Sequence, residues 1–109
     1  MPALFFGVEC MSWAYQRAYS LLRTVLNNIQ RLQTASSRDE KDKLVTDMLI
    51  DASCAMSIIQ VLAPRSKRTK SICDSLIQFR SRLESGMADF NAMVSYVTDA
   101  MLKILEVMV

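Results

Sequence analysis

The spacing of apolar residues constrains this chain more than any other feature of its sequence. From about residue 8 to residue 35, apolar side chains recur at alternating steps of four and three. This spacing places them along one face of an α-helix, and such a face is stable only when another apolar surface covers it. Because 51% of the residues are apolar, a chain of 109 residues can bury a core as one domain. The sequence predicts an all-α fold, with residues 1–109 forming a single helical-bundle domain. The inward set of the first helix is Met11, Tyr15, Ala18, Leu22, Val25, Ile29 and Leu32.

A second helix is predicted between about residues 37 and 62. Ser37 is followed three residues later by Glu40, which has the form of a capping box at a helix N-terminus. Pro64 ends the helix, because the residue before a proline is displaced from the α region. The inward residues of this helix are Leu44, Met48, Ala52, Ala55, Ile59 and Leu62.

The third segment, from about residue 67 to residue 108, continues the same rhythm, and Gly86 is its only candidate break. The apolar phase continues across Gly86, and Ser85-Gly86 is short for a connection between helices. An interior glycine costs a helix only about 1 kcal/mol. The pattern therefore favours an antiparallel bundle of three long helices, the third one bent. The alternative is a break near Gly86, which gives four helices.

The choice between these two forms determines whether a partner is needed. A continuous helix over residues 67–108 would be about 63 Å long, much longer than its neighbours. We therefore expect its apolar overhang to pack against a second copy or another protein, whereas a closed four-helix bundle needs no partner. The interface expected along this methionine- and leucine-rich seam consists of Met87, Phe90, Val94, Val97, Met101, Ile104 and Met108.

The composition argues against catalysis and against bound cofactors. The chain has no histidine, which removes the usual general base near neutral pH and the commonest metal ligand. Its two glycines cannot form a glycine-rich phosphate loop, and its acidic residues lack the spacing of a calcium-binding loop. We expect a non-enzymatic protein with no cofactor, no metal and no small-molecule substrate.

The three cysteines, Cys10, Cys54 and Cys73, are odd in number and show no C-x-x-C spacing, so they indicate buried thiols in a reducing compartment. The apolar segment 3–8 is shorter than a secretory signal needs, and no uncharged stretch reaches the roughly 20 residues of a membrane span. The expected location is the cytoplasm of the cell or of a host cell, without membrane contact.

An alternative function is binding to a double-stranded nucleic acid. Arg17, Arg31 and Arg38 are separated from one another by multiples of seven residues and so share one helix face. Arginines in such a row can follow phosphates along a duplex backbone, although they can also face solvent or pair with Asp47 and Asp51. The aromatic residues Trp13, Tyr15 and Tyr19 are expected in the core, which favours duplex RNA over single strands. The candidate nucleic-acid contacts are Arg17, Arg23, Arg31, Arg38, Arg65, Lys67, Arg68 and Lys70.

The stretch from Ser37 to Ser66 has a serine and acidic helix start, a long helix and a proline-containing basic turn that leads into a further helix. This layout resembles the small dimeric silencing suppressors of insect nodaviruses, which bind double-stranded RNA. The resemblance implies a helical dimer and a viral origin. The second helix is acid-rich where that family is expected to be basic, and the resemblance assigns no residue roles.

Overall fold

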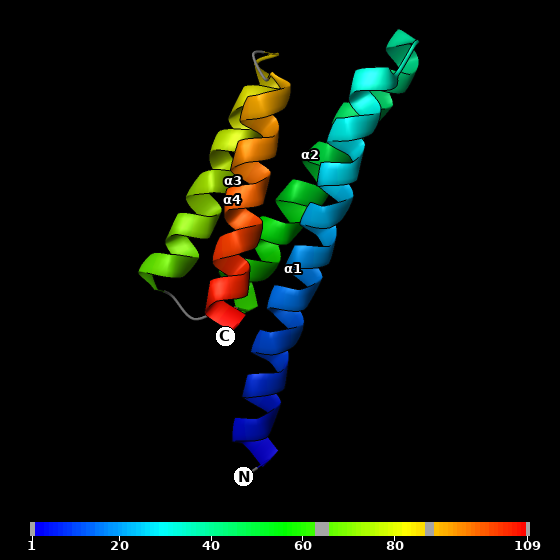
Figure 1. Cartoon of the computed structure of the whole chain (residues 1–109). Helices are drawn as coiled ribbons and strands as arrows, with labels where there is room; N and C mark the ends of the chain where they lie inside the picture. Colours follow the sequence, from blue (N-terminus) through cyan, green and yellow to red (C-terminus); the bar gives the residue numbers. More distant parts are fainter. Residues whose placement is uncertain (1, 63–65, 87–88, 109) are drawn as a thin grey trace.

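The computed structural model describes the backbone of residues 2–62, 66–86 and 89–108, and the side chains of residues 13–61, 66–86 and 89–108. Within these ranges the chain is all-helical, with no strand. The elements are α1 (Pro2–Thr34), α2 (Arg38–Leu62), α3 (Lys67–Glu84) and α4 (Phe90–Met108) (Figure 1).

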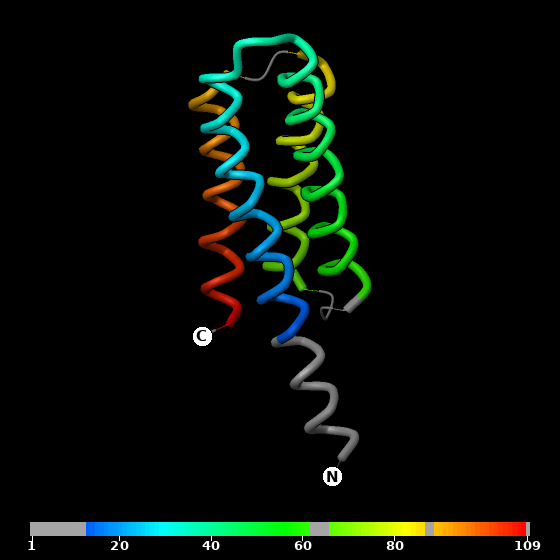
Figure 2. The backbone as a smooth tube through the Cα atoms, turned by 90° about the vertical axis from the view of Figure 1, so that its right-hand side faces the viewer, coloured from blue at the N-terminus to red at the C-terminus, as the bar shows by residue number. Residues whose placement is uncertain are grey.

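The four helices pack in a ring, each antiparallel to the helices that precede and follow it in the chain. Over the described residues, α1 packs against α2 and α4, and α3 packs against the same two helices (Figures 1 and 2). In the same residues the backbones of the diagonal pairs, α1 with α3 and α2 with α4, stay more than 8 Å apart between Cα atoms. This is the up-down-up-down arrangement in which the apolar face of each helix points to one shared centre.

The core contains the residues that the three-four spacing predicts. The described inward residues of the first two predicted helices are buried, apart from Leu32, which is half-buried. Met11 and Leu62 were also predicted inward, and their side chains lie outside the described ranges. The largest side chains that are fully buried are Phe79, Leu22, Ile29, Met48, Ile59, Ile72, Leu76 and Ile104.

Two predicted helix starts are confirmed by hydrogen bonds. Ser37 Oγ accepts a hydrogen bond from the Glu40 amide at 3.1 Å. Ser66 Oγ accepts one from the Thr69 amide at 3.1 Å, with Ser66 in an extended conformation. Each bond satisfies an amide that has no partner inside the helix. The helix ends expected near residues 35 and 62 are also confirmed, because α1 ends at Thr34 and α2 ends at Leu62.

The prediction of one continuous third helix is wrong, because α3 ends at Glu84 and α4 begins at Phe90. Gly86 has φ +70°, a left-handed conformation that ends helices and suits glycine. Asp89 then starts α4, since its Oδ1 accepts a hydrogen bond from the Ala92 amide at 2.7 Å. The connection is therefore residues 85–89, longer than Ser85-Gly86 alone. The glycine followed by an N-capping aspartate was the signal for this break.

Candidate interaction surfaces

Most of the predicted interface seam faces the inside of the chain's own bundle. Val97 and Ile104 are fully buried and Met101 is 8% exposed, while Phe90 and Val94 are half-buried. Because α3 and α4 fold back on each other, these side chains fill the core of one chain. Met87 lies outside the described residues. A second chain can therefore reach Val97, Met101 and Ile104 only if the bundle opens.

The outer face of α4 changes character along its length. Its first half carries polar residues such as Asn91, Ser95 and Thr98. Its last turns carry Leu102, Leu105 and Met108, which are 55%, 40% and 40% exposed. We call these last three residues the α4 stripe. Of its members, sequence reasoning found only Met108, because Leu102 and Leu105 lie outside the three-four seam on which that reasoning relied.

Charged side chains of both signs border the α4 stripe. A shallow hollow beside it is lined by Arg68, Leu102, Leu105 and Glu106. The adjoining hollow is lined by Lys67, Arg68, Ser71, Lys103 and Glu106. Lys67 and Arg68 come from the start of α3, whereas Lys103 and the acidic Glu106 come from α4, so charges of both signs lie together beside the stripe.

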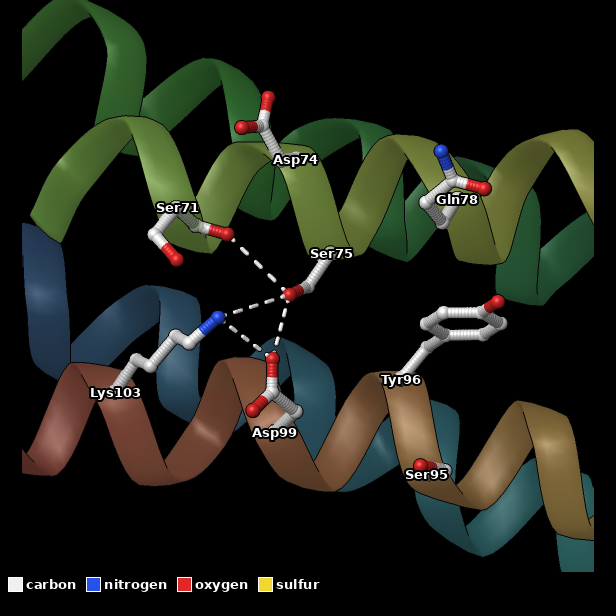
Figure 3. Close-up of a pocket in the computed structure, with 8 residues that line it drawn as sticks. All are labelled: Ser71, Asp74, Ser75, Gln78, Ser95, Tyr96, Asp99 and Lys103. Atoms are coloured by element: carbon white, nitrogen blue, oxygen red, sulfur yellow. Dashed lines mark hydrogen bonds and ion pairs between the residues drawn. The ribbon is translucent and has the colours of Figure 1, made fainter. Parts of the chain in front are cut away.

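A polar cluster joins α3 to α4 (Figure 3), and its surroundings share Ser71 and Lys103 with the hollow described above. Ser75 Oγ donates a hydrogen bond to Asp99 Oδ2 at 2.6 Å. Lys103 Nζ lies 2.8 Å from the same carboxylate oxygen and 3.4 Å from Ser75 Oγ. The hydrogen bonds from Lys103 and then Ser75 hold the pKa of Asp99 below its usual value, against a smaller opposing effect of burial. We call these three residues the α3–α4 clasp.

The clasp links two helices and does not have the geometry of an activated serine. A serine nucleophile needs a neighbouring base that can take its proton. Here the ammonium group of Lys103 donates to the Asp99 carboxylate at 2.8 Å, and an ammonium group has no lone pair with which to take the Ser75 proton. Ser75 directs its hydroxyl proton to Asp99. The arrangement therefore satisfies three polar groups at a helix–helix contact.

The candidate nucleic-acid residues that the structure describes are all exposed. Arg23 lies over the ring of Tyr19, with the guanidinium carbon 5.9 Å from the ring centre. Burial and then the charge of Asp47 raise the pKa of Asp51 on α2, and the charge of Arg17 on α1 opposes this rise with a smaller effect. Arg65 lies outside the described residues.

The structure does not bring the predicted basic residues together on one surface. The first group, Arg17, Arg23 and Arg31, lies on α1, whereas Lys67, Arg68 and Lys70 lie on the diagonally placed α3. Arg38 is the first residue of α2, and α3 starts beyond the other end of that helix (Figure 2). A helix of 25 residues is about 37 Å long, and this length separates Arg38 from the lysines.

Two smaller predictions about burial are wrong. Trp13 is 54% exposed, although Tyr15 is buried as expected and Tyr19 is half-buried. Cys54 is exposed, whereas Cys73 is buried. Trp13 and Cys54 both lie outside the inward sets of their helices, and helical position outweighs the apolar character of a side chain. The side chain of Cys10 lies outside the described ranges.

Within the described ranges, one helix segment, Arg38–Val61, is long and apolar enough to cross a membrane by length and composition alone. The same segment carries Asp47 and Asp51 and provides the α2 part of the bundle core. Among the described side chains, no group of three or more histidine, cysteine, aspartate or glutamate residues is placed to hold a metal ion.

Comparison of the sequence and the fold with models of protein families, with curated proteins and with solved structures yields no match. Functional inference therefore depends on the surfaces of this molecule itself.

Proposed function

We propose that this protein is a non-enzymatic helical interaction module that self-associates, with the α4 stripe of one copy docking on the α4 stripe of another. The observation that supports the proposal is the exposure of Leu102, Leu105 and Met108 on consecutive turns of one helix. Burying a leucine side chain completely contributes about 1.5–3 kcal/mol, so covering two partly exposed leucines on each copy favours association.

The rim of the stripe favours a second copy over an unrelated partner. In a twofold dimer the same patch meets itself, so a residue on one side of the rim faces the opposite side of the partner's rim. Arg68 and Glu106 line the same hollow and carry opposite charges. When the twofold axis passes through this hollow, Arg68 of each copy lies near Glu106 of the other. Such rim charges fix orientation more than they raise affinity.

Sedimentation velocity across a concentration series tests this function. The wild-type chain is expected to show a reversible monomer–dimer equilibrium. Leu102→Asp introduces a charge into the stripe and is expected to leave only monomer. Ile50→Asp is the matched control, because Ile50 is also 55% exposed but lies on α2. A wild-type chain that is monomeric at every concentration, or a control that dissociates as readily, overturns the proposal.

The exposure of the basic residues supports a second candidate function, binding to duplex RNA through its backbone. None of the described candidates takes part in an ion pair within 4.0 Å in the described part of the chain. Their charges are therefore available to phosphates. The basic residues lie on different helices, so binding through all of them would wrap the duplex around the bundle. Because they would contact phosphates, this binding would not depend on the base sequence.

Fluorescence anisotropy with a labelled RNA duplex of about 20 base pairs tests the second candidate, because backbone recognition needs only duplex of that order. Affinity is expected to fall steeply with salt, as counterion release requires. Replacing both Arg17 and Arg31 with alanine should weaken binding to all sequences alike. Arg80→Ala is the control, since Arg80 lies 4.0 Å from Glu84 on α3. Absence of binding at low salt eliminates this function.

A further inference from the structure

The apolar registers of α3 and α4 match across the turn that separates them. The seam of α3 ends with Leu83 and the described seam of α4 starts with Phe90, and these positions are seven residues apart. On an uninterrupted helix, an interval of seven residues brings side chains to the same face within about 20°. When two helices fold back on each other, the turn between them lets each helix direct its own apolar face to the core. The folded-back form therefore does not require the registers of α3 and α4 to match.

In the described part of the folded-back turn, the features that specify it are local. Gly86 adopts φ +70°, and a Cβ atom added there would meet nothing within 4 Å. Asp89 caps α4 through its hydrogen bond to the Ala92 amide. These two features belong to the turn itself, whereas the buried surface of α4 lies against α1 and α3. Among the described residues, straightening the chain between Glu84 and Phe90 would therefore remove the left-handed turn at Gly86, the bond from its amide to the Leu83 carbonyl and the Asp89 cap, and it would leave the four helices intact.

We infer that Gly86 and Asp89 form a hinge through which two copies of this chain exchange α4. In the exchanged dimer, α3 and α4 of each chain form one helix, and α4 packs on α1 and α3 of the other chain. Val97 and Ile104 then fill the partner's core, and the α3–α4 clasp forms between chains.

The exchanged dimer requires the matching apolar registers of α3 and α4. The two long helices lie antiparallel about a twofold axis that passes between them at the hinge. When that axis is perpendicular to the plane of the two helices, both α1–α2 pairs lie on the same side of that plane. Each long helix must then present one continuous apolar face to both cores, and the interval between Leu83 and Phe90 provides this face.

The inference goes beyond the proposed function, because it uses the inner face of α4 and is independent of the α4 stripe. It is tested in the Leu102→Asp background, where docking through the stripe is removed. Gly86→Ala penalises the left-handed turn and favours the continuous helix. The equilibrium between these two forms is expected to shift towards the continuous helix by roughly 30-fold per hinge. Each dimer has two hinges, so the Kd for dissociation of the dimer is expected to fall on the order of 1,000-fold. The Kd is measured after the chains have been unfolded and refolded together, so that they can exchange α4.

Two further variants control for altered folding. Gly86→Asn adds a side chain at the same open position, but asparagine tolerates the left-handed conformation, so a much smaller change is expected. Asp89→Ala removes the cap of α4 without touching Gly86 and should also favour the dimer. Circular dichroism checks that each variant keeps its helices. Gly86→Ala and Asp89→Ala chains that are folded and remain monomeric overturn the inference.

Chemical cross-linking identifies the topology of the dimer. Ser75→Cys and Asp99→Cys are introduced into a chain whose own cysteines are replaced by alanine, because these side chains meet at 2.6 Å. A short thiol-to-thiol cross-linker then joins α3 to α4. Exchange gives covalent dimers on a denaturing gel, whereas cross-links confined to single chains overturn it. Loss of wild-type dimer on Leu102→Asp concerns only the proposed function, so the two ideas fail separately.

Discussion

The carboxylate of Asp99 is lower in pKa in the folded chain than its usual value, because Lys103 and Ser75 hydrogen-bond to it. A lowered pKa contributes stability above the unfolded value, and this contribution is lost as the pH falls through the folded pKa. We expect Asp99→Asn to be less stable than wild type at pH 7, by less than about 1 kcal/mol because the side chain is 48% exposed. Urea unfolding at a series of pH values should show this difference closing below about pH 4. A difference that does not change with pH contradicts the assignment.

Asp51 has the opposite shift, and its prediction has the opposite sign. Burial and then the charge of Asp47 raise its pKa, although Arg17 partly offsets them. The folded chain therefore holds this proton more tightly than the unfolded chain, and folding stability falls as the pH rises through the raised pKa. Asp51→Asn should increase the free energy of unfolding at pH 7 by roughly 0.5 kcal/mol. The same urea series should show the gain vanish in acid, and a loss of stability at pH 7 would show that the attraction of Arg17 dominates.

At the scale of the helices, the caps make the most direct prediction. Ser66→Ala removes the acceptor of the Thr69 amide at the start of α3 and should cost about 1 kcal/mol. Amide hydrogen exchange is expected to accelerate first in the opening turn of α3. Ser81→Ala, at an exposed position of the same helix, is the control and should change little. Equal effects from the two variants would mean that the cap contributes no specific stability.

The helices were more predictable than the turn that divides the last two. The ends near Thr34 and Leu62 followed from Ser37 and Pro64, because capping and proline act over a few residues. The break at Gly86 was missed because the register on its two sides agrees, and this agreement outweighed the local signal. Asp89 identifies the break, since a glycine marks the end of one helix and an aspartate before the next apolar residue marks the start of another.

For the whole molecule, the stability of the bundle depends on its shared centre. Phe79 is the largest fully buried side chain. Phe79→Ala should cost about 3–5 kcal/mol, a large part of the roughly 5–15 kcal/mol available to a domain of this size. Chemical denaturation measures this loss. Ile77→Ala is the matched control on the same helix, because Ile77 is 40% exposed, and it should cost far less.

The candidate surface was less predictable than the core for a physical reason. Periodicity identifies an apolar face but cannot show whether the same chain or another chain covers it. Val97, Met101 and Ile104 were therefore expected at an interface and lie inside the bundle. Leu102 and Leu105 break the period and were overlooked. The row of arginines was predicted from spacing along one helix. Its separation from Lys67 and Arg68 follows from the arrangement of the four helices, which spacing along one helix does not contain.

The two described cysteines differ in exposure, so their labelling rates can measure transient opening of the bundle. Cys73 is buried on α3, and burial and then the charge of Asp74 raise its thiol pKa, whereas Cys54 is exposed on α2. Alkylation requires an accessible thiolate, so Cys73 should react only when α3 transiently leaves its neighbours. Mass spectrometry of the labelled peptides gives the labelling rate of Cys73 relative to that of Cys54. This ratio would then measure how often α3 opens in the chain of natural sequence.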